Sequence, residues 1–219
     1  MNGTITIFRK EWHCFTGSDR GMFVLYALLI LTWSSMLAAP QNADFPAGPL
    51  WLIFFSVVIS ANFSNTVFIA ERIHGNLEIL LTSGLSRQNI LYGKMLFVGG
   101  MSCGIGLLCI GLSMILRHLL FDSTLIPVST GDIILYGSAV FMNTANSAYL
   151  SIRMPNPRLL HFANLLLLGS LVTLYSLLTF YIPVSSIVLS AILTGIGCAG
   201  TIAARRLYNS EKILQPVHW

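Results

Sequence analysis

Six long apolar segments, separated by short polar stretches, dominate the pattern of this chain. Each is about 20 residues long, which is the length of a helix that crosses the hydrocarbon core of a bilayer. Prolines and other turn-forming residues stand between several of them. The pattern therefore predicts an all-α membrane protein with six transmembrane helices, at residues 21–39, 49–70, 94–116, 133–152, 160–181 and 184–204.

The first 20 residues mix apolar and charged side chains with helical spacing. Ile5, Phe8, Trp12 and Phe15 recur on one face of a helix, whereas most charged residues of this stretch fall elsewhere. Such a pattern is typical of an amphipathic helix that lies in the membrane interface. We therefore expect an interfacial helix ahead of the first span; a plain juxtamembrane tail is the alternative.

Composition agrees with a membrane location. Of 219 residues, 55% are hydrophobic and only 9% are charged, whereas soluble domains carry about 25% charged residues. Membrane lipid is therefore the expected surrounding of residues 21–204, which form one membrane domain. Residues 205–219 are expected to form a polar tail.

The net charge of +4 would also suit a nucleic-acid partner, but the placement of the basic residues argues against one. With six spans, only Arg117 falls on the side opposite the termini. Cytoplasmic segments of membrane proteins are enriched in Lys and Arg, so both termini are expected in the cytoplasm of a cell with a bacterial-type inner membrane. The basic residues on that side are Arg9, Lys10, Arg20, Arg72, Arg87, Lys94, Arg153, Arg158, Arg205, Arg206 and Lys212.

Motifs of common enzyme sites are missing from the sequence. It contains no Gly-x-x-x-x-Gly-Lys-Ser/Thr, His-Glu-x-x-His or Gly-x-Ser-x-Gly, and its cysteines fit neither a metal site nor a disulfide framework. Glu71, Lys94, Arg117 and Asp132 fall at predicted helix ends, which disfavours an ion-coupled pump with charges inside the membrane. We therefore expect no catalytic residue, no metal and no cofactor bound by this chain.

Two groups of small or polar residues stand out within the predicted spans. The second span carries serines at every fourth position, and the fourth span is the most polar of the six. Polar side chains in hydrocarbon must face protein or water, so they either join helices by hydrogen bonds or line a translocation path. The path candidates are Ser60, Asn62, Asn65, Asn143 and Asn146.

In the third span, Gly100 and Gly104 form a Gly-x-x-x-Gly step that predicts close helix packing.

The most informative stretch is the charged segment 71–94 between the second and third spans. Leu77, Leu80 and Leu81 fall on one helical face, and most of its charged residues lie elsewhere. Ser86 is a candidate N-cap for the following helix. A short helix under the membrane, joined to two spans, is expected to pass a push from a soluble partner into both.

This segment resembles the signature of the ABC type-two permease family, the membrane half of many bacterial ATP-driven exporters. The matching residues cover about one tenth of the chain. Residues 83–85, Ser-Gly-Leu, depart from the family pattern, since many members carry a proline there. The residues that match are Glu71, Arg72, Gly75, Leu77, Glu78, Leu80, Leu81, Ser86, Arg87, Gly93 and Lys94.

The resemblance implies a transmembrane subunit driven by a separate cytoplasmic ATPase, which would bind ATP and Mg. It also implies a second permease copy, identical or different, because family members work in pairs. The coupling segment at 71–87 would dock on the ATPase. Its contact residues would be Glu71, Arg72, Gly75, Leu77, Glu78, Leu80, Leu81 and Arg87.

Two alternatives stay open at this point. One is a membrane scaffold or assembly factor in which the same segment recruits a soluble partner without transport. The other, a variant within the exporter class, is a haem-export-like subunit of cytochrome c maturation, which shares the short six-span plan. The substrate is not indicated by any residue pattern.

Overall fold

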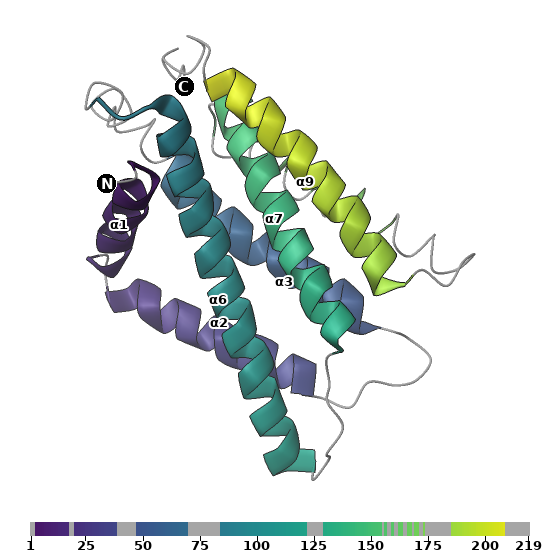
Figure 1. Cartoon of the computed structure of the whole chain (residues 1–219). Helices are drawn as coiled ribbons and strands as arrows, with labels where there is room; N and C mark the ends of the chain where they lie inside the picture. The colour runs from purple at the N-terminus through teal and green to yellow at the C-terminus, as the bar shows by residue number, and fades with distance from the viewer. Residues whose placement is uncertain are drawn as a thin grey trace.

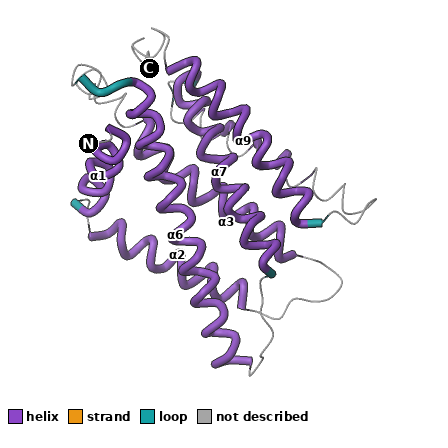
Figure 2. The backbone as a smooth tube through the Cα atoms, in the orientation of Figure 1, coloured by secondary structure: helices purple, strands orange, loops and turns teal. Residues whose placement is uncertain are grey.

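A computed structural model describes residues 3–17, 20–38, 47–69, 84–121, 129–154 and 185–208, with single residues between 156 and 173 (Figure 1). Within these ranges every regular element is helical and no strand occurs (Figure 2). The elements are α1 (Gly3–Thr16), α2 (Arg20–Ala38), α3 (Ala47–Ser64), the π-helix η1 (Asn65–Ile69), α6 (Arg87–Phe121), α7 (Thr130–Arg153) and α9 (Ser186–Tyr208).

Local polar contacts explain where two of the long helices begin. The Ser86 hydroxyl accepts a hydrogen bond from the Asn89 backbone N–H at 3.2 Å, so the predicted N-cap is confirmed, although α6 starts well before residue 94. At α7, Ser129 and Asp132 form a capping box in which each side chain binds the other's backbone N–H. Both caps satisfy amide groups that a helix start leaves without partners.

Helices α7 and α9 pack side by side and run in the same direction (Figure 1). Near their starts, the Ser186 hydroxyl donates to the Asp132 carboxylate at 3.2 Å. Further along, Gly197 lies against Phe141, and at the far ends Arg206 and Arg153 line one groove. By contrast α6 is antiparallel to α7, because the Tyr136 hydroxyl donates to the Ser102 carbonyl while Gly99 faces Thr144.

Described basic residues gather at one end of this bundle. The start of α6 and the end of α9 meet there, where the Arg205 guanidinium can donate to the side-chain oxygen of Gln88. Figure 1 shows α1 beside the first turns of α6 at this end. Arg117 and Asp132 belong to the opposite end, at the close of α6 and the start of α7. The separation follows the pattern that the sequence predicts for the two sides of a membrane.

Two of the described helices, Arg87–Leu120 and Ser186–Tyr208, are long and apolar enough to cross a bilayer, while Phe23–Ala38 and Leu52–Phe68 are shorter apolar helices. Helices occupy five of the six predicted spans, but only two of them pass as membrane-spanning by length and composition, so the six-span topology stays a prediction. The predicted fifth span lies largely outside the described residues. Its described members are helical, and Leu167 packs against a cluster that includes Leu135 and Leu193.

Helix α1 forms as predicted, but only part of its predicted apolar face contacts the protein. Ile7 and Glu11 are only 1% and 6% exposed, whereas Ile5 and Trp12 are 47% and 43% exposed. Of the apolar face that the sequence predicts for the membrane interface, Phe8 and Phe15 contact the protein core while Ile5 and Trp12 stay exposed. The cause is tertiary: Ile7 fits against Gly93, so α1 lies along the first turns of α6.

Aromatic rings join α1, α2, α3 and α6. Phe15 of α1 lies 5.7 Å from Phe63 of α3, and Tyr26 of α2 stacks on the same Phe63 ring at 5.2 Å. Phe97 of α6 meets Phe63 edge-on at 6.2 Å. Such ring pairs add about 0.5–1.5 kcal/mol each beyond their buried area.

Candidate functional site

The flanks of the charged segment are described, but most of the segment is not. Its predicted contact residues, apart from Arg87, lie outside the described residues: Glu71, Arg72, Gly75, Leu77, Glu78, Leu80 and Leu81. The chain is described up to η1 and again from Gly84, whose φ of 76° is the left-handed conformation that glycine adopts without strain. Arg87 is half-buried in the first turn of α6.

Gly93 and Lys94, the last two residues of the family-like pattern, both make tertiary contacts. A Cβ on Gly93 would lie 2.6 Å from the Ile7 Cβ, so only glycine lets α1 approach α6 this closely. The Lys94 side chain turns the other way, and its Nζ donates a hydrogen bond to the Val67 carbonyl of η1 at 2.9 Å. Together these residues join α1, α6 and the end of the second predicted span.

Lys94 is not at a helix end, as the sequence suggested, but at the eighth position of α6 with 0% exposure. A buried ammonium is costly unless other groups compensate it. Here the Val67 carbonyl binds it, the Phe68 ring lies 5.7 Å away, and the buried Glu11 carboxylate attracts it. Because a π-helix departs from the regular α-helical bonding pattern, the Val67 carbonyl is a natural acceptor for a side chain.

A polar seam connects α3 and α7. We define it by five buried residues spaced a turn apart on each helix: Ser56, Ser60, Ser64, Asn143 and Ser147. The Asn143 side-chain amide donates to the Ser56 hydroxyl at 3.2 Å. The Ser60 and Ser64 hydroxyl oxygens have no hydrogen-bond partner among the described residues. The seam therefore both joins the helices and leaves acceptors available to water or a ligand.

The five predicted path residues do not converge. Ser60 and Asn143 lie in the polar seam, but Asn62 is exposed on the outside of α3. Asn65 belongs to η1 and is half-buried, and Asn146 faces α9, since its side-chain oxygen is 2.7 Å from the position of a Cβ on Gly200. The hydrogen-bonding interpretation holds for Asn143, and a translocation path lined by these residues stays a prediction.

Close helix packing occurs at glycines other than the predicted pair. A Cβ on Gly104 would meet nothing within 4 Å, and one on Gly100 would only touch Phe8 at 3.9 Å. Instead, Gly106 lies against the Tyr136 ring and Gly197 against Phe141. The Gly100–Gly104 step stays a prediction for contacts beyond the described part of the chain.

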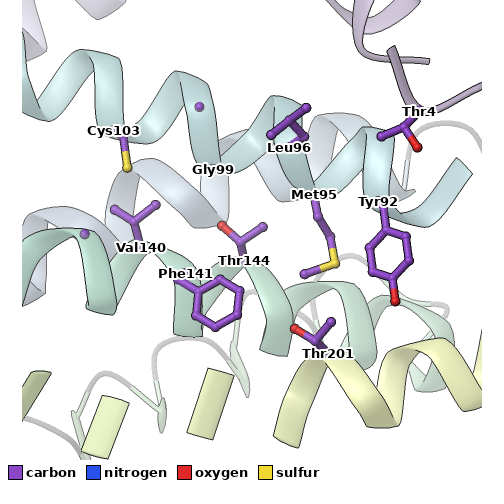
Figure 3. A pocket seen from close by; sticks show the side chains of 12 residues that line it. Thr4, Tyr92, Met95, Leu96, Gly99, Cys103, Val140, Phe141, Thr144 and Thr201 are labelled. Carbon is purple, nitrogen blue, oxygen red and sulfur yellow. The ribbon is translucent and has the colours of Figure 1, made fainter. Parts of the chain in front are cut away.

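The structure also contains a cavity that the sequence pattern did not indicate. It has a volume of about 470 Å³ and lies between α6, α7 and α9, close to the start of α1 (Figure 3). Its walls include Met95, Gly99, Cys103, Phe141 and Thr144. The cluster of glycines in α6 was visible in the sequence, but only the packing shows that some of them leave space rather than close it.

Among the described residues no three His, Cys, Asp or Glu side chains gather as a metal site would require. The four cysteines, Cys14, Cys103, Cys109 and Cys198, are all free thiols. A scan of the sequence against models of known protein families, and a search of curated proteins, found no match.

Proposed function

We propose that this chain is the membrane subunit of an ATP-binding-cassette exporter of the type-two permease kind. In this proposal it crosses the inner membrane six times with both termini in the cytoplasm. A separate ATPase subunit, which binds ATP and Mg, docks on segment 71–87. A second permease copy completes the pore.

The parallel packing of α7 and α9 supports the six-span topology. Two parallel neighbours must be joined by a chain that returns from the end of the first to the start of the second. The 30 or so residues between Arg153 and Ser186 include the fifth apolar segment and are long enough for a helical return at about 1.5 Å per residue. If α2, α3, α6, α7 and α9 each cross the membrane, this returning segment would be the sixth crossing.

The observation that carries the coupling proposal is the link between the two helices on either side of the charged segment. The segment leaves from η1 and enters α6, and the Lys94–Val67 hydrogen bond ties these two elements within the protein. A force on the segment would therefore move the end of α3 and the start of α6 as one unit. Gly93 extends the unit to α1 through Ile7.

Movement of α3 relative to α7 would alter the polar seam. Asn143 and Ser56 would change or lose their hydrogen bond, and the Ser60 and Ser64 hydroxyls would become accessible from one side. Alternation between two packings of helices is the usual structural form of such a transition. We therefore expect ATP binding on the partner subunit to change the packing and hydrogen bonds of the polar seam.

Purification from the native cell in mild detergent, followed by an ATPase assay, tests the proposal. We expect a stoichiometric partner with a P-loop, whose ATPase activity depends on this chain. Glu78→Lys should uncouple that activity or lose the partner, while Asp122→Lys, in the predicted outer loop, should leave both unchanged.

Two results would contradict the proposal. A partner without nucleotide-dependent activity would favour the scaffold alternative. Normal coupling in both Glu78→Lys and Gly75→Leu would remove the docking role of segment 71–87.

A further inference from the structure

The cavity between α6, α7 and α9 is bounded almost entirely by apolar groups. Met95, Cys103, Val140 and Phe141 contribute side chains to its walls, and Leu96, which is 53% exposed, lies at its rim (Figure 3). Its volume of about 470 Å³ falls in the range of small-molecule sites, about 300–1,000 Å³. A charged or strongly polar solute would find few hydrogen-bond partners in these walls.

Missing side chains create the space. Gly99 on α6 and Gly137 on α7 both line the cavity, and a Cβ on Gly137 would meet nothing within 4 Å. Helix α9 packs extensively on α7 but touches α6 only sparsely. The cavity is therefore open to the side between α6 and α9, which in a bilayer is the direction from which lipid arrives.

One polar group in the wall lacks a partner. Thr144 is 2% exposed, and its hydroxyl has no hydrogen-bond partner among the described residues. In Figure 3 its oxygen is directed from α7 toward the α6 side of the cavity. Buried hydroxyls are normally hydrogen-bonded, so the arrangement suits a ligand that carries one acceptor on an apolar body.

Leu167, in the segment between α7 and α9, contacts the core at a place away from the cavity. It packs with Ile53, Leu135 and Leu189. On α7, Leu135 lies on a different face from Gly137 and Thr144, which line the cavity. The contact that is described therefore lies away from the cavity.

We propose that this cavity binds a single acyl chain of a membrane phospholipid, inserted sideways between α6 and α9, with the Thr144 hydroxyl donating to the ester carbonyl oxygen. The apolar walls fit the chain, and the lateral opening fits its access from the bilayer. The proposal requires membrane insertion but not ATP-driven transport. Its test therefore uses this chain without an ATPase and can fail separately from the exporter proposal.

The test is photo-crosslinking in nanodiscs of phosphatidylethanolamine and phosphatidylglycerol, with a trace of phosphatidylethanolamine that carries a diazirine in one acyl chain. We expect cross-links, located by peptide mass spectrometry, to concentrate in residues 92–103 and 137–144. Gly137→Leu should fill the cavity and reduce them by roughly tenfold. Gly111→Leu is the matched control, because that glycine is exposed on α6 with nothing within 4 Å of its Cβ position.

A second pair of measurements examines Thr144. An ester-linked probe should label the cavity more than its ether-linked analogue, and Thr144→Val should abolish that preference while leaving the melting temperature unchanged or higher. If exposed positions such as Leu107 are labelled as strongly as the cavity residues, and Gly137→Leu does not reduce the cavity labelling, the probe reports only lipid on the outer surface. That result would overturn the proposal. Disulfide formation between Cys103 residues of two copies, with no lipid labelling, would overturn it in favour of a second copy as the occupant.

Discussion

At the scale of single residues, Lys94 is the buried charge that connects α6 with η1. Its ammonium is buried at the junction of α1, α6 and η1, where it donates to the Val67 carbonyl and faces the Glu11 carboxylate. The sequence showed a lysine beside a glycine at the start of an apolar run. It could not show the burial, because burial depends on the extension of α6 over residues 87–93 and on α1 packing over it.

Lys94→Met tests the role of this ammonium. The methionine has similar length but no donor, so the Val67 carbonyl would lose its hydrogen bond, and the Glu11 carboxylate would keep only its ion pair with Lys10. A buried acceptor left without its hydrogen bond typically costs about 1–3 kcal/mol. We expect a clear drop in melting temperature in detergent, partly restored by adding Glu11→Gln; wild-type stability of the single variant would contradict this.

The hydrogen bond between Asn143 and Ser56 makes a smaller, separately measurable contribution. Interhelical hydrogen bonds in membrane proteins average about 0.6 kcal/mol in double-mutant cycles. A cycle of Asn143→Ala and Ser56→Ala should therefore give a coupling energy of about 0.5–1.5 kcal/mol in reversible unfolding in detergent. The same cycle with Asn62→Ala in place of Ser56→Ala is the control, because Asn62 is exposed, and it should show no coupling.

At the scale of elements, the apolar periodicity was sufficient to predict helices at five of the six spans and ahead of the first span. The start of α6 was predicted well from its local cap at Ser86, whereas its end was predicted poorly, because α6 continues to Phe121 beyond the predicted residue 116. The packing of Ile7 of α1 against Gly93 of α6 and the cavity both arise from contacts between distant segments. Periodicity within one segment carries no signal for them.

The packing of α1 on α6 gives a prediction at this scale. Gly93→Leu would place side-chain atoms where Ile7 now lies, so α1 should detach from α6 while the long helices stay folded. We expect faster proteolysis within residues 3–17 and a shift in the fluorescence of Trp12, with nearly unchanged helix content. Gly111→Leu adds the same bulk to the same helix in open space, and it should change neither signal.

At the scale of the whole molecule, the two ends of the bundle differ in charge and in their contacts. One end gathers α1, η1, the start of α6 and the end of α9, with most of the described basic residues. The other end holds the capping box of α7 and its hydrogen bond to the start of α9. The described basic residues thus mark one end of the bundle, as the sequence predicts for the cytoplasmic side of a membrane protein.

This asymmetry predicts the outcome of a labelling experiment on sidedness. In a background without native cysteines, Ser185→Cys and Thr130→Cys are exposed positions at the α7–α9 starting end, and a membrane-impermeant maleimide should label both in intact spheroplasts. Native Cys14, exposed on α1, should be labelled only after permeabilisation. Because α7 and α9 are parallel, labelling of Ser185→Cys and Thr130→Cys from the same side requires the intervening chain to cross back. If Ser185→Cys instead behaves like Cys14, the six-span topology is wrong, and the exporter proposal loses its structural support.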